Sequence, residues 1–162
     1  MTSVTRLQWR AVGWAAAAAL LTAALGATLT DLGPWYQSLH EPSWKPPDAA
    51  FGLIWTVIFS LCAVAGVLAW SGARTVNGRQ WVLALFALNG FLNILWSLIF
   101  FKLHRPDLAL VEVGVLWVSI LALIVALYRS SSLASFLLVP YLVWVGLAAA
   151  LNFEVVAMNG PF

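Results

Sequence analysis

The fold is decided by residues 49–73, AAFGLIWTVIFSLCAVAGVLAWSGA, where 25 consecutive positions carry no charged side chain. A helix that rises about 1.5 Å per residue needs roughly 20 residues to cross about 30 Å of hydrocarbon. Because lipid offers no hydrogen-bond partners, the backbone polar groups of such a run must be satisfied within the segment. The run is also too long and too uniformly apolar for a barrel strand, so it predicts a transmembrane helix.

Similar runs occur on both sides of this one. Of the 162 residues, 63% are hydrophobic, and the charged residues are only eight Lys plus Arg and six Asp plus Glu. A water-soluble domain could not cover its surface with so few charges. We therefore predict an all-α membrane protein of one domain, residues 1–162, with a long structured loop at residues 31–47 that we call the lid. The five expected transmembrane helices are residues 9–30, 48–73, 80–102, 107–128 and 132–156.

The first apolar run has a second interpretation. Arg6 and Arg10 precede an alanine-rich stretch, as in a cleavable signal peptide. The apolar part spans 20 residues, which is longer than the roughly 7 to 15 that such signals use. We therefore expect the run to be retained as the first transmembrane helix.

The distribution of basic residues predicts the orientation in the membrane. Five spans place the two termini on opposite sides. The N-terminal side carries five basic residues near span ends and the other side carries three, which predicts a cytoplasmic N-terminus. The five are Arg6, Arg10, Arg74, Arg79 and Arg129, and the three are Lys45, Lys102 and Arg105.

Ten tryptophans are several times the usual share for a chain of this length. Indole rings favour the membrane interface, which accounts for those near span ends, namely Trp9, Trp14, Trp70 and Trp81. Others lie well inside the spans and are candidates for the bundle interior, either as plain packing or as an aromatic pocket: Trp55, Trp96, Trp117 and Trp144.

The third span carries a polar stripe. Asn89, Asn93, Trp96 and Phe100 follow spacings of four, three and four, which places them on one helical face. Amides that face lipid would leave donors and acceptors unpaired, so we expect the stripe to face other helices. It serves either as hydrogen bonds between helices or as the polar floor of a ligand site.

The fifth span contains Pro140, which lacks an N–H and pushes against the carbonyl of Phe136. We expect the helix to bend there. Trp144 and Ala148 follow at spacings of four on the same face, where a large ring beside a small residue leaves room for a flat ligand. A purely structural bend is the alternative.

Glu112 in the fourth span is a costly residue in a membrane, because intramembrane carboxylates are usually paired or inward-facing. We expect it to reach toward the headgroups and toward Lys102 or Arg105. A role in ligand or proton binding is the alternative.

Conventional catalytic motifs are missing from the sequence. His40, His104 and Cys62 have no metal-ligand spacing, so no metal site is predicted. No phosphate-binding glycine loop or Ser-His-acid set is evident, and no basic stripe suggests nucleic acid. His40 is expected to be a solvated loop histidine, with axial ligation of haem as the alternative.

Several short motifs occur in order along the chain: WY at 35–36, PSWKPP at 42–47, IWT at 54–56, LN at 92–93, PY at 140–141 and LNF at 151–153. With Phe51, Trp96 and Trp144, they make the chain resemble the TspO/MBR family, the tryptophan-rich sensory proteins and translocator proteins. The resemblance covers nearly the whole chain.

The resemblance implies a five-helix bundle, commonly a homodimer, with a pocket closed by the first loop. Family members bind porphyrins and haem-related tetrapyrroles as ligands, and no obligatory cofactor is implied. Some bacterial members are credited with light- and oxygen-dependent porphyrin breakdown that depends on two tryptophans, which match Trp55 and Trp144. The expected ligand-binding residues are Trp35, Tyr36, Trp44, Trp55, Asn93, Trp96, Trp144 and Ala148.

The chain departs from the family pattern at several positions. Phe59 replaces a frequent tyrosine, and Ala49 stands where some relatives have another aromatic residue. Phe153 occupies the aromatic position of the cholesterol-type pattern with no basic residue after it, so cholesterol binding through that element is not predicted. The third span has no pair of small residues four apart to indicate a dimer interface.

Two other classes of function are compatible with the residues. The aromatics could serve only as packing and interface belt in a structural protein or transporter subunit. A sterol- or lipid-binding translocator is the other alternative.

Overall fold

The computed structural model describes residues 2–162, with side chains described from Ala11 onward. The elements in order are α1 (Thr2–Leu29), α2 (Pro34–Gln37), α3 (Asp48–Gly72), α4 (Val76–Ser97), the π-helical turn η1 (Leu98–Lys102), α5 (Pro106–Tyr128), α6 (Ser132–Leu137) and α7 (Val139–Asn159). Within the described residues, five helical segments are long and apolar enough to cross a membrane. The all-α membrane fold with five spans is therefore confirmed. The side chains of Arg6, Trp9 and Arg10 lie outside the described part.

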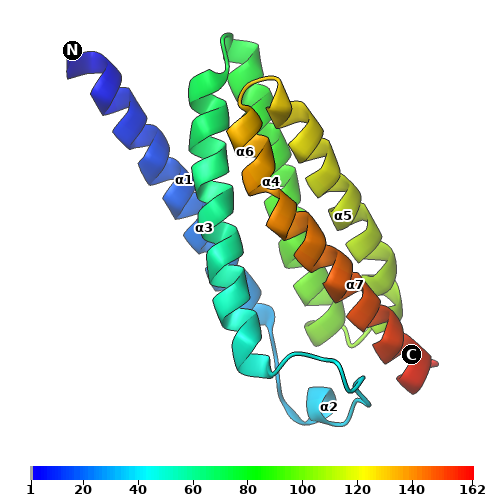
Figure 1. The fold of residues 1–162 in the computed structure, drawn as a ribbon. Helices are drawn as coiled ribbons and strands as arrows, with labels where there is room; N and C mark the ends of the chain where they lie inside the picture. The colour runs from blue at the N-terminus through cyan, green and yellow to red at the C-terminus, as the bar shows by residue number, and fades with distance from the viewer. Residues whose placement is uncertain (1) are drawn as a thin grey trace.

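Figure 1 shows how the helices are arranged. The N-terminus and the α3–α4 and α5–α6 connections lie at one end, which we call the arginine end because Arg74, Arg79 and Arg129 lie there. The lid, α2 and the C-terminus lie at the other end, the lid end. Helix α1 runs beside α3 but diverges from it toward the N-terminus. The bundle core is formed mainly by the other long helices.

The core sits where α3, α5 and α7 meet. Ile58, Leu116, Ile120, Tyr141 and Val145 are buried there at 2% exposure or less. In α1, none of the described side chains is buried. The first helix is thus the most loosely packed span, and large spaces remain beside it.

Helix α4 begins earlier than the sequence indicated. We expected a helix from residue 80, but α4 starts at Val76. The reason is the hydroxyl of Thr75, which accepts a hydrogen bond from the Gly78 N–H at 3.0 Å and caps the helix. Asn77 and Gly78 therefore lie in the first turn of α4.

The last span is interrupted, as the proline suggested, but the interruption falls before Pro140. Helix α6 ends at Leu137, and α7 starts at Val139 with Pro140 in its first turn. Proline is favoured in a first turn because its missing N–H would have no partner there. The break thus lies at Leu138, whose side chain is fully buried.

At the lid end of α4 the chain forms the π-helical turn η1. The Leu103 N–H donates to the Leu98 carbonyl at 3.0 Å, five residues back. Such wide turns are rare and often lie at functional sites. Here two adjacent aromatic residues, Phe100 and Phe101, are both buried, at 5% and 8% exposure.

Candidate functional site

A cavity of about 760 Å³ lies beneath the lid, between α1, α3, α4 and α7. We call it the lid cavity. Three of its wall residues are indoles, Trp55 from α3, Trp96 from α4 and Trp144 from α7. Six of the eight expected ligand-binding residues line it: Tyr36, Trp55, Asn93, Trp96, Trp144 and Ala148.

The other two expected residues, Trp35 and Trp44, do not line the lid cavity. Trp35 packs edge-on against Phe100 at 6.0 Å between ring centroids and stacks on His104 at 4.1 Å. His104 holds a left-handed backbone conformation, with φ at 52°. Trp44 is 49% exposed on the outside of the lid. Trp35 therefore anchors the lid to the turn after η1.

The wall indoles contact further aromatic rings. Trp55 stacks on Phe59 at 5.3 Å and meets Tyr141 edge-on at 6.1 Å. Trp144 meets the edge of Phe51 at 5.4 Å. Trp144 Nε1 is buried and has no hydrogen-bond partner within residues 11–162. A buried donor without an acceptor is costly, and this one belongs to a residue of the cavity wall.

The polar stripe of α4 faces the other helices, as expected. Asn89 donates to the Ser119 hydroxyl at 2.9 Å, and Asn93 donates to the Tyr141 hydroxyl at 3.2 Å. Trp96 Nε1 donates to Asn152 Oδ1 at 3.2 Å. These bonds tie α4 to α5 and α7. Asn93 also lines the lid cavity. The same amide therefore links two helices and contributes a polar group to the cavity.

The lid is fixed to the end of α7. The Asn159 side chain accepts from the His40 N–H at 2.7 Å and donates to the His40 carbonyl at 2.9 Å. Pro42 is buried beneath the lid surface. His40 itself is exposed and does not line the lid cavity, which agrees with a loop histidine.

A charged cluster closes the lid cavity on the lid side. Lys45 Nζ lies 2.7 Å from Glu41 Oε1 and 2.6 Å from Asp48 Oδ1, and 5.0 Å from the Tyr36 ring centroid. Burial opposes the charge on Lys45, but bonds to Asp48, Glu41 and Tyr36 outweigh it and raise its pKa. Burial raises the pKa of Tyr36 to about 12. Two carboxylates thus surround one ammonium, and Lys45 is not a free cation.

The expected contacts of Glu112 are wrong. Lys102 pairs with Asp31 at 3.2 Å, and Arg105 pairs with Asp107. The Glu112 side chain is only 8% exposed, and both carboxyl oxygens are buried with no hydrogen-bond partner within residues 11–162. It does not line the lid cavity. Lys102 and Arg105 pair with partly exposed carboxylates because a pair with the buried Glu112 would require the cation to lose its hydration.

Several residues of the site were not anticipated. Glu41, Asp48 and Phe51 line the lid cavity, and Asn159 anchors the lid. The only signal for Glu41 was its position four residues before Lys45. Asn159 carries no sequence signal, because its partner lies 119 positions away.

Comparison with known proteins agrees with this architecture. Residues 11–158 match the model of the TspO/MBR family. The chain is 38% identical over 125 residues to the tryptophan-rich protein TspO of Chlorobaculum tepidum, covering 77% of this chain and 79% of that protein. It is 36% identical over 132 residues to the TspO protein of Archaeoglobus fulgidus, covering 82% and 84%.

A human protein is also similar. The translocator protein of Homo sapiens is 33% identical over 120 residues, which cover 74% of this chain and 71% of that protein. The match to the family model includes all five candidate membrane helices except the last residue of the fifth. The chain is a multi-pass integral membrane protein and belongs to the TspO/MBR family.

Proposed function

We propose that the protein binds a porphyrin or a related tetrapyrrole in the lid cavity, and acts in its sensing, transport or disposal. The observation that carries this proposal is the convergence of Trp55, Trp96 and Trp144 on one cavity of about 760 Å³. Ligand cavities are usually about 300 to 1,000 Å³ and mostly apolar, with a few polar groups. A large flat apolar ring matches indole walls, since aromatic rings favour stacked and edge-on contacts.

The polar groups of the lid cavity support the same ligand class. Trp144 Nε1 is a buried donor without an acceptor within residues 11–162. Rotation of the indole toward the lid cavity would let it donate to a ring nitrogen or carboxyl oxygen of the ligand. The carboxylates of a tetrapyrrole would meet the charged cluster of Lys45, Glu41 and Asp48, which we call the lid cluster. Because Asp48 is half exposed, its carboxylate has room to turn toward solvent and leave Lys45 to a ligand acid.

A titration tests the proposal. Protoporphyrin IX is added to the detergent-solubilised protein, and quenching of tryptophan fluorescence is followed. We expect saturable quenching, with about fivefold weaker binding for Trp144→Phe, which lacks the N–H. Trp81→Phe is the matched control, because Trp81 is 69% exposed near the arginine end and lines neither large cavity. Quenching that never saturates, or equal affinity for all three proteins, would contradict the proposal.

A second candidate activity is light- and oxygen-dependent porphyrin degradation. It is favoured by the position of Trp55 and Trp144, which both line the lid cavity. A photoexcited porphyrin would take an electron from one of these indoles and pass it to molecular oxygen, which becomes superoxide. A ground-state porphyrin would return an electron to the indole radical, and the porphyrin radical so formed would combine with superoxide to give the oxidised ring. We expect Trp55→Phe and Trp144→Phe to bleach bound porphyrin more slowly than the wild type under the same illumination. Unchanged bleaching with normal binding would rule out this activity.

A structural role makes a different prediction. If the wall indoles only pack, Trp144→Leu lowers thermal stability without a selective effect on porphyrin affinity. Measuring the unfolding midpoint and the titration on the same variant separates the two outcomes. We expect a loss of affinity larger than the change in stability explains.

A further inference from the structure

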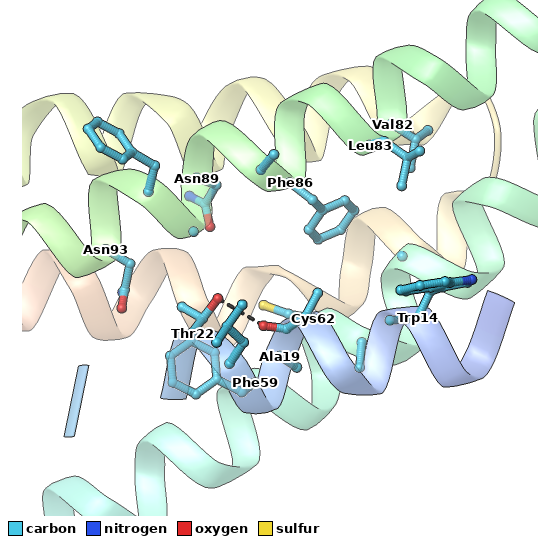
Figure 2. Close-up of a pocket in the computed structure, with 18 of the residues that line it drawn as sticks. Trp14, Ala19, Thr22, Phe59, Cys62, Val82, Leu83, Phe86, Asn89 and Asn93 are labelled. Atoms are coloured by element: carbon cyan, nitrogen blue, oxygen red, sulfur yellow. Dashed lines mark hydrogen bonds between the residues drawn. The ribbon is translucent and has the colours of Figure 1, made fainter. Parts of the chain in front are cut away.

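A second cavity, of about 970 Å³, lies between α1, α3 and α4 toward the arginine end. We call it the wedge. Figure 2 shows it lined by Trp14 of α1, Cys62 of α3, and Leu83 and Phe86 of α4. It meets the lid cavity at Phe59, which lines both. The two cavities also share Asn93. The inference below rests on wedge residues that do not line the lid cavity, and it does not depend on the tetrapyrrole proposal.

The shape of the wedge follows from how α1 packs. A Cβ at Gly90 of α4 would lie 3.3 Å from the hydroxyl of Thr22, so α1 and α4 nearly touch there. From this point α1 diverges toward its N-terminus (Figure 1). Small residues on its inner face, including Ala11 and Ala15, line the wedge and are only half-buried. The helices therefore close the wedge at one end and leave it open along the other.

The surroundings of the wedge determine what fills it. These helices cross the bilayer, so an open apolar space between them borders hydrocarbon rather than water. Its polar wall groups, such as Asn89 and Asn93, already donate to other helices. A linear hydrocarbon chain is the filler that the bilayer itself supplies.

The arginine end supplies charge beside the wedge. The Arg79 guanidinium lies 5.6 Å from the ring centroid of Trp70, and Trp70 lines the wedge. Arg79 Nε is buried and has no hydrogen-bond partner within residues 11–162. Arg74 and Arg129 lie at the same end, and none of the three has an ion pair among the described residues. The six acidic residues of the chain all lie in the lid half: Asp31, Glu41, Asp48, Asp107, Glu112 and Glu154.

We propose that the wedge binds an anionic phospholipid, with one acyl chain between α1, α3 and α4 and the phosphate on Arg79. Phosphate oxygens would accept from the terminal N–H groups of the Arg79 guanidinium, the paired geometry that arginine favours. The positive potential of the arginine end selects against a zwitterionic lipid, whose headgroup brings its own ammonium. This gives the protein a lipid site distinct from its lid cavity.

Fluorescence quenching by brominated lipids tests the proposal. The protein is placed in phosphatidylcholine nanodiscs that contain a small fraction of phosphatidylglycerol or phosphatidylcholine with brominated acyl chains. Bromine quenches indoles on contact, and Trp14 and Trp70 line the wedge. We expect brominated phosphatidylglycerol to quench more strongly, with a preference of about fivefold in relative affinity. Equal quenching by the two lipids would overturn the proposal.

Two pairs of variants locate the site. Arg79→Gln should abolish the preference, whereas Arg129→Gln, an exposed arginine at the same end, should keep it. Ala15→Phe should fill the wedge and abolish the preference, whereas Ala17→Phe on the exposed face of α1 should not. Circular dichroism and the unfolding midpoint verify that each variant is folded. If Arg79→Gln and Arg129→Gln lose the phosphatidylglycerol preference equally, the anionic lipid is attracted by the overall charge of the arginine end, and the assignment to Arg79 is overturned.

Discussion

Asn159 holds the backbone of His40 by both of its groups, with 2.7 Å from the His40 N–H to Oδ1 and 2.9 Å from Nδ2 to the His40 carbonyl. The same amide also donates to the Val155 carbonyl at 2.8 Å, which fixes its rotamer on α7. A single side chain at the end of the last helix therefore positions the middle of the lid. The lid is anchored at this point independently of any ligand.

Asn159→Leu should loosen the lid. It removes two hydrogen bonds to His40, each worth about 1 kcal/mol net, so the lid opens more often. We expect protoporphyrin to dissociate about tenfold faster or more, measured by displacement in stopped flow. Faster proteolysis in the loop after α2 should accompany it. The control is Asn77→Leu, an exposed residue at the arginine end, and equal rates for both variants would contradict the anchoring role.

Glu112→Leu should stabilise the protein. The substitution keeps a side chain of similar size and removes two buried oxygens that have no partner within residues 11–162. A buried polar group without a partner costs about 1 to 3 kcal/mol, so the free energy of unfolding should rise by that order. Thermal unfolding in detergent measures it, with Glu154→Leu, which is half-buried, as control. A lower midpoint for Glu112→Leu would show that the carboxyl has a partner in the membrane.

The lid cluster should resist alkaline pH. Because the folded pKa of Lys45 is raised above its ordinary value of 10.5, its stabilisation is complete below that pH. It is lost only as the pH rises through the higher folded pKa. The difference in unfolding midpoint between wild type and Lys45→Met should therefore stay constant from neutral pH to about 10. A difference that shrinks between pH 7 and 9 would be inconsistent with these ion pairs.

Gly72→Ala should destabilise the arginine end. A Cβ at Gly72 would collide with the backbone carbonyl oxygen of Ser130, so the end of α3 and the α5–α6 connection would have to separate. Gly114→Ala is the matched control, since a Cβ there meets nothing within 4 Å. We expect the free energy of unfolding to fall by about 1 to 3 kcal/mol in Gly72→Ala and to rise by up to about 1 kcal/mol in Gly114→Ala. Thermal midpoints in the same detergent give both values.

The sequence predicted the features that depend on local residue patterns. The length of apolar runs predicted five spans, and the spacing of Asn89, Asn93 and Trp96 predicted an inward stripe. These features follow from helical periodicity and the cost of unpaired amides in lipid. Trp55 and Trp144 were expected on one cavity because they match family positions, and both line it.

What the sequence could not predict depends on contacts between distant segments. The stacking of Trp35 on His104 is one example, because the lid conformation decides which face of the ring is covered. The pairing of Lys45 with two carboxylates likewise follows from the conformation of the lid. The small residues of α1 indicate close packing as readily as a cavity. Only the angle between α1 and α3 decides between these, and no local pattern encodes it.

The π-helical turn η1 has a consequence for how this protein can change over evolution. One extra residue in a turn rotates everything after it by about 100° relative to a continuous α-helix. Asn93, which precedes η1, hydrogen-bonds to Tyr141 of α7. Within η1, Phe100 contacts Trp35 and Phe101 contacts Tyr36. Insertions or deletions within η1 would therefore turn the two rings that the lid packs against, while Asn93, which precedes η1, keeps its contact with α7.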